Sequence, residues 1–149
     1  MKKLFIFLFL IPLISAAQTT KTVDIFTNGN CKVSCMETLI LDSLVSAYVI
    51  FEAKDDRLPT LTNNFTICYD TPQNVFKFLS EIEKFIADDS TTSTEIRNHK
   101  VEIEKIKGSK EVKVYDERGL IFHRFSPKII TGIKTDLSEW TVKNNIELE

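Results

Sequence analysis

The stretch that decides the fold runs from Asn64 to Asp89 and reads NFTICYDTPQNVFKFLSEIEKFIADD. The residues before Asp70 alternate between apolar and polar side chains, which is the pattern of a β-strand. From residue 72 to about 87, apolar residues recur at three- and four-residue steps, as in an amphipathic helix. Thr71 is the expected N-cap, and Pro72 is the expected first helical residue. A strand therefore leads into a helix whose apolar face has to pack on a sheet.

Downstream, the sequence predicts a loop, a three-strand meander and a second helix. Residues 88–98 are mostly Asp, Ser, Thr and Asn, a composition typical of a solvated connector. Ser126-Pro127 repeats the hydroxyl-proline helix start of Thr71-Pro72. The predicted strands are residues 99–106, 111–116 and 120–125, and the predicted helix is residues 128–144, with an apolar face of Ile130, Ile133, Leu137 and Trp140.

Upstream, residues 22–27 and 48–51 are predicted strands, and Asn28-Gly29-Asn30 is a turn signal. Residues 37–45 fit a helix or a strand, because their apolar side chains satisfy both periods. Short hairpins imply antiparallel pairing, and two one-sided helices imply that both cover the sheet on one side. The sequence therefore predicts one α+β domain, residues 18–149, in which helices at about 72–87 and 128–144 cover a mostly antiparallel sheet.

The N-terminal residues predict export. Lys2 and Lys3 precede an apolar run from Leu4 to Ile14, and small residues follow it up to Ala17. This is the pattern of a signal peptide, residues 1–17, and its short lysine-rich form resembles a bacterial one. The run is shorter than the roughly 20 residues that span a bilayer, so no stable membrane anchor is expected after cleavage. We expect a periplasmic or extracellular protein.

Composition narrows the classes of partner and chemistry. Removing Lys2 and Lys3 leaves 17 basic against 21 acidic residues, a net charge of −4. Nucleic acid is a poor partner for such a chain, because phosphate binding needs a concentrated positive surface. The sequence lacks a glycine-rich phosphate loop, a Gly-x-Ser-x-Gly motif and a His-Glu-x-x-His motif, and its two histidines are isolated. No cofactor, metal site or catalytic residue is predicted.

Three cysteines, Cys31, Cys35 and Cys68, lie in the part expected to be exported. In an oxidising compartment two of them should form a disulfide. The spacing of Cys31 and Cys35 allows a bond if the chain between them is helix-like, and either could instead reach Cys68. The sequence leaves all three pairings open. Cys68 lies in an apolar strand and suits the role of the unpaired, buried cysteine.

The segment around Cys31 also resembles the opening of a thioredoxin or glutaredoxin. A strand at residues 23–27, then Cys31, then a helix-compatible segment and the strand at Tyr48 follow that family's order, and Leu58-Pro59-Thr60 stands where the family keeps its cis-proline. The resemblance implies a redox pair, Cys31 and Cys35. The family separates its two cysteines by two residues, whereas three intervene here.

Two functions follow as expectations. The leading hypothesis is a non-enzymatic binding, inhibitor or envelope-accessory module that contacts another envelope or secreted protein. Its expected contact region is the sheet surface around Tyr115, His123 and Arg124. The alternative is a thiol–disulfide enzyme that uses Cys31 and Cys35.

Overall fold

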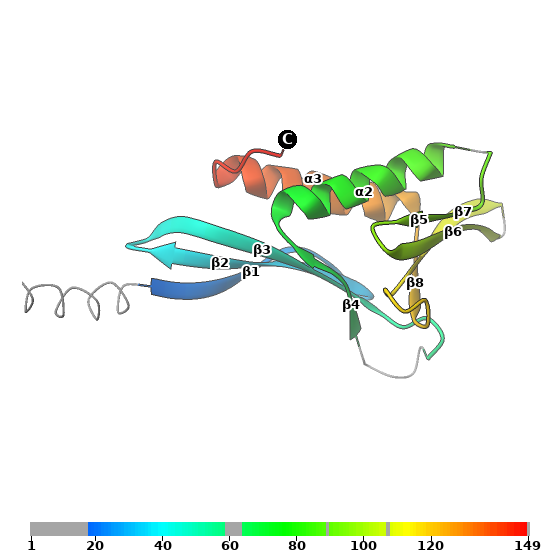
Figure 1. Cartoon of the computed structure of the whole chain (residues 1–149), viewed down its shortest axis with the longest axis horizontal. Helices are drawn as coiled ribbons and strands as arrows, with labels where there is room; N and C mark the ends of the chain where they lie inside the picture. Colours follow the sequence, from blue (N-terminus) through cyan, green and yellow to red (C-terminus); the bar gives the residue numbers. More distant parts are fainter. Residues whose placement is uncertain (1–17, 59–63, 89, 107, 149) are drawn as a thin grey trace, which may run out of the picture.

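The computed structural model describes residues 18–58, 64–88, 90–106 and 108–148 (Figure 1). Their elements repeat one order, four strands and then a helix. The first set comprises β1 (Gln18–Asn28), β2 (Cys31–Ile40), β3 (Ser43–Lys54), β4 (Asn64–Asp70) and α2 (Pro72–Ala87). The second set comprises β5 (Ser93–Ile96), β6 (His99–Ile106), β7 (Ser109–Tyr115), β8 (Phe122–Phe125) and α3 (Pro127–Lys143).

The strands form two four-stranded antiparallel sheets, β1-β2-β3-β4 and β5-β6-β7-β8. The α+β prediction is confirmed, but the strands divide into two sheets where a single sheet was expected. The second sheet also has four strands where three were predicted, because β5 lies inside the segment predicted to be a loop. Arg97 and Asn98, both with left-handed φ, turn β5 back onto β6. Pairing with β6 thus makes a strand of a short segment in which Ile96 is the one apolar residue.

Residues 37–45, which fitted either a helix or a strand, form the β2–β3 hairpin. Leu41 and Asp42 form its turn, with φ of 50° and 60°. These left-handed values match the turns that suit the twist of a tight hairpin. β2 pairs with β1 on one side and with β3 on the other, so sheet hydrogen bonds decide in favour of the strand.

The helices begin at the hydroxyl-proline signals. α2 spans the predicted residues 72–87, and the Thr71 hydroxyl accepts a hydrogen bond from the Asn74 N–H at 3.4 Å. α3 is one residue displaced from the predicted 128–144. Ser126 is its N-cap residue but makes no side-chain capping bond. Among the described residues, no helix is long and apolar enough to cross a membrane.

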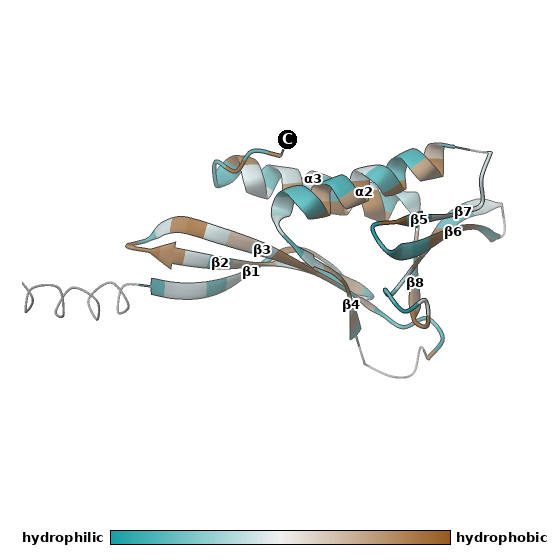
Figure 2. Cartoon of the chain, in the orientation of Figure 1, coloured by the Kyte–Doolittle hydropathy of each residue, from teal (hydrophilic) through white to brown (hydrophobic). Residues whose placement is uncertain are grey.

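The core lies between the helices and one face of each sheet. α2 and α3 pack side by side, α2 against β3, β4 and β5, and α3 against β1, β7 and β8 (Figure 1). Hydrophobic residues occur in these strands, and along α2 they alternate with polar residues (Figure 2). Trp140, on the apolar face predicted for the second helix, lies in this core together with Phe51, Phe78, Phe85 and Phe125.

Candidate contact surface

All three cysteines are free thiols, so this structure does not contain the disulfide that the sequence led us to expect. Cys31 and Cys35 lie on the same strand, where a four-residue separation corresponds to about 13 Å. Cys68 lies on β4, and β3 intervenes between β2 and β4, which puts about 9.5 Å between those strands. A disulfide needs Cα atoms within about 7 Å, so no pair of the three is in reach.

The structure also removes the geometry that the redox alternative requires. Cys31 and Cys35 are buried in β2, and no helix begins between them. Burial raises the pKa of Cys31 to about 11. Burial, together with the nearby Glu37 carboxylate, raises the pKa of Cys35 to about 12. A catalytic cysteine needs an accessible thiol with a lowered pKa, and neither Cys31 nor Cys35 has those properties in this structure. Pro59 and Thr60, the expected cis-proline segment, lie outside the described residues.

The predicted contact residues do not share one surface. Tyr115 and Arg124 lie on the face of the second sheet turned away from the core, whereas His123 lies on the inner face and is only 4% exposed. Expecting His123 to be exposed was wrong, because β8 directs it against Phe125 and the end of β3. Its Nδ1 lies 2.8 Å from both the Lys54 carbonyl oxygen and the Asp56 carboxylate. Both partners are acceptors, so Nδ1 carries the proton. Its hydrogen bonds connect β8 of the second sheet to the end of β3 in the first.

The outer face of the second sheet binds its own side chains. The Tyr115 hydroxyl donates to Glu102 at 2.6 Å, and Arg124 donates to Glu104 at 2.9 Å. Burial and the Glu102 carboxylate raise the pKa of Tyr115 to about 12. The Arg124 guanidinium also lies 5.0 Å from the centre of the Phe122 ring. These side chains are already paired with each other, so a partner would have to break existing bonds to use them.

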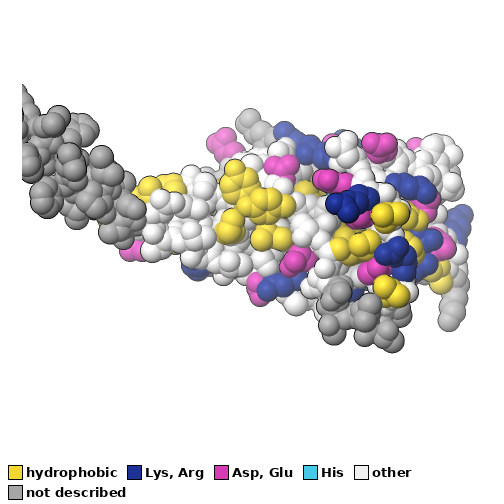
Figure 3. Space-filling view, turned by 60° about the horizontal axis from the view of Figure 1, so that its bottom comes forward, with side chains coloured by type: hydrophobic (Ala, Val, Ile, Leu, Met, Phe, Trp, Pro, Cys, Tyr) yellow, Lys and Arg dark blue, Asp and Glu magenta, His cyan; other side chains and the backbone are white. Residues whose placement is uncertain are grey.

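The first sheet has an apolar patch on its outer face. Met36, Tyr48, Ile50 and Tyr69 lie on the side opposite the buried core residues of β2 and β3; we call these four the tyrosine patch. The rings of Tyr48 and Tyr69 stack at 5.5 Å with an interplanar angle of 18°, and their exposures are 41% and 53%. Figure 3 shows hydrophobic side chains gathered on the face that this sheet turns away from the helices.

Sequence reasoning missed the tyrosine patch although a signal for it was present. Residues 48–51 are apolar at every position, so β3 has apolar side chains on both faces. The predicted helices cover only one side of a sheet, which leaves the other set of apolar side chains in solvent. Tyr69 is on a different strand, and only the β3–β4 register places it next to Tyr48.

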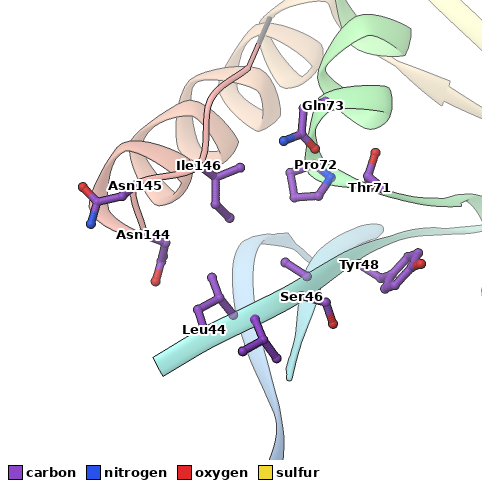
Figure 4. A pocket seen from close by; sticks show the side chains of 11 residues that line it. Leu44, Ser46, Tyr48, Thr71, Pro72, Gln73, Asn144, Asn145 and Ile146 are labelled. Carbon is purple, nitrogen blue, oxygen red and sulfur yellow. The ribbon is translucent and has the colours of Figure 1, made fainter. Parts of the chain in front are cut away.

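A cavity of about 330 Å³ adjoins the tyrosine patch at Tyr48 (Figure 4). It lies between the first half of β3, the start of α2 and the residues that follow α3. Its lining residues, none of them charged, are Leu44, Val45, Ser46, Ala47, Tyr48, Thr71, Pro72, Gln73, Asn144, Asn145 and Ile146.

The described residues contain no group of three or more His, Cys, Asp or Glu side chains placed to share a metal ion. Comparison with protein-family models, with curated proteins and with solved structures finds no match to this chain.

Proposed function

We propose that this protein is an exported, non-enzymatic module that binds another envelope or secreted protein through the tyrosine patch. The observation that supports the proposal is the exposed, stacked pair Tyr48 and Tyr69 on a sheet face that no described helix or strand covers. Tyrosine is enriched at protein interfaces, because its ring supplies apolar contact area while its hydroxyl stays satisfied by water or by a partner.

The two outer sheet faces differ in a way that favours the tyrosine patch. On the second sheet, the charged side chains pair with each other across strands, for example Lys113 with Glu104 at 3.2 Å. Burying that face would remove these charges from water with little new pairing in return. Burying the tyrosine patch removes apolar surface from water, which contributes about 25 cal/mol for each Å² to association before the entropic cost of binding is subtracted.

The test is photo-crosslinking in the cells that produce the protein. Benzoylphenylalanine replaces Tyr69 in one variant and, as the matched control, Tyr115 in another. Both positions are tyrosines on outer sheet faces, so labelling differs only in the surface that it reports. We expect one discrete crosslinked protein from position 69 and none from position 115. Crosslinks from position 115 alone would show that the contact region lies on the second sheet and not at the tyrosine patch. No crosslink from either position would contradict the proposed function.

Export is tested separately by the mass and N-terminal sequence of the protein recovered from the medium or envelope fraction. Cleavage after Ala17 would give a chain that begins at Gln18. Recovery of the full-length chain from the cytoplasm alone would contradict export.

A further inference from the structure

The first half of β3 has a strand edge that no described strand pairs with. β4 pairs with β3 only from Val49 to Lys54. At Asp70 the chain leaves the sheet, because the Asp70 carboxylate accepts hydrogen bonds from the Thr71 N–H at 2.7 Å and the Asn74 amide at 2.9 Å, and Pro72 starts α2. Residues 43–48 therefore continue past the end of β4.

The β2–β3 register identifies which backbone groups point to this edge. The Lys54 N–H donates to the Asn30 carbonyl, on the β2 side. Backbone groups alternate sides along a strand, and the register is unbroken from Ala53 to Ser46, so Tyr48 and Ser46 also point toward β2. The N–H and C=O of Ala47 therefore point away from β2, toward the open edge. The register shift at Thr38 and Leu39 leaves Val45 without a partner on β2, and this bulge ends the straight edge.

The open edge faces the uncharged cavity. In Figure 4, Leu44 of β3 and Ile146 of the C-terminal tail point toward one another across it, and Pro72 closes the side nearest α2. The Gln73 side-chain amide donates a hydrogen bond to the Glu147 carbonyl oxygen at 2.9 Å, and this bond connects the C-terminal tail to the start of α2. The site thus combines a strand edge that no described strand pairs with and walls of apolar and uncharged polar side chains.

We propose that the β3 edge at Ala47 accepts an extended, uncharged segment of the partner protein as an added strand. An unpaired strand edge is complementary to another extended backbone, and the adjoining cavity takes an apolar side chain of the added strand. The segment continues the position of β4 beyond Asp70. This inference rests on the proposed binding function and specifies how the partner is held.

The experiment starts from a phage-displayed library of short random peptides selected on the full protein. The best peptide is synthesised with a fluorescent label and titrated against the wild type, Ala47→Pro and Thr22→Pro. Proline at residue 47 removes the N–H that points to the open edge while keeping the bonds to β2. Thr22→Pro is the matched control: Thr22 is exposed on β1, and the same alternation points its backbone away from β2, at the opposite edge of the sheet.

We expect Ala47→Pro to weaken peptide binding at least tenfold and Thr22→Pro to leave it unchanged. A peptide N-methylated at alternate residues should also lose binding, and this readout holds even if Ala47→Pro folds poorly. Unchanged binding to a folded Ala47→Pro protein, loss on Thr22→Pro alone, or a library that yields no binder would overturn the inference. Dimerisation of the wild type that Ala47→Pro abolishes would assign the edge to a second copy of this chain and overturn it too.

Failure here is distinguishable from failure of the proposed function. A discrete crosslink from residue 69 would still support the proposed binding function. If no peptide then binds in a way that depends on the β3 edge, only strand addition as the mode of binding is contradicted.

Discussion

At the scale of single residues, the cysteines show how secondary structure decides whether two side chains are close enough to react with each other. On a helix, Cys31 and Cys35 would be neighbours, whereas on β2 they are separate small apolar side chains in the core. Their raised pKa values keep them protonated at neutral pH, and the thiolate is the reactive form. Buried thiols of this kind resist oxidation, so three free cysteines are compatible with the proposed export.

The first prediction concerns these thiols. At pH 7 to 8, a disulfide reagent such as DTNB should react slowly with the folded protein, because the pKa values of about 11 for Cys31 and Cys68 and about 12 for Cys35 lie far above the pH of the assay. After unfolding in guanidinium chloride under non-reducing conditions, three thiols should react rapidly. A count of one in the unfolded protein would reveal a disulfide and contradict the strand assignment of β2 or β4.

At the scale of elements, the sequence predicted best where one pattern was repeated over many residues. α2 was predicted over its full length, because a broad apolar stripe, Thr71 and Pro72 all agree. β5 was missed, because Ser93–Ile96 carries no alternation that can be read without its partner β6. The tyrosine patch was missed for a related reason, since the contact between Tyr48 and Tyr69 depends on strand register.

The second prediction concerns Gly132, inside α3. A Cβ at this position would meet the Phe26 ring at 3.4 Å, which is an ordinary van der Waals contact. Gly132→Ala should therefore raise the free energy of unfolding by roughly 0.5–1 kcal/mol through helix propensity. Urea denaturation followed by the single tryptophan measures the change.

Gly119→Ala is the matched comparison and should have the opposite sign. Gly119 has open space around it but a φ of +67°, which strains any residue with a Cβ. A destabilised Gly132→Ala protein would mean that β1 and α3 are packed too closely to admit the methyl group.

At the scale of the whole molecule, two polar junctions join the halves. Between the helices, Glu83 of α2 accepts hydrogen bonds from Lys134 at 2.6 Å and from Thr131 at 2.8 Å, both on α3. Between the sheets, the Asp56 carboxylate accepts from the Arg124 N–H at 2.7 Å, and the Asp56 N–H donates to the Phe122 carbonyl at 3.0 Å. The sequence marked Asp56 only as part of a polar loop, because its partners lie 66 to 68 positions away along the chain.

The third prediction concerns the Asp56 junction. Asp56→Ala would remove the acceptor of the Arg124 N–H and leave the buried His123 Nδ1–H with the Lys54 carbonyl oxygen alone, so the free energy of unfolding should fall by about 1–3 kcal/mol. Asp55→Ala is the neighbouring control, since Asp55 bonds only locally to Arg57 and such surface pairs contribute about 0–1 kcal/mol. Thermal denaturation of both variants measures the difference. Equal effects would show that the junction does not stabilise the fold.

The order of the strands has a consequence for how fast the chain folds. Every pairing within the two sheets joins strands that are consecutive in the sequence, so each hairpin closes only a short loop. The hydrogen bond from the Trp140 indole to Glu37, by contrast, spans 103 residues. We therefore expect the hairpins to form early in each half, and the contact of α3 with the first sheet, which closes the longer loop, to form late.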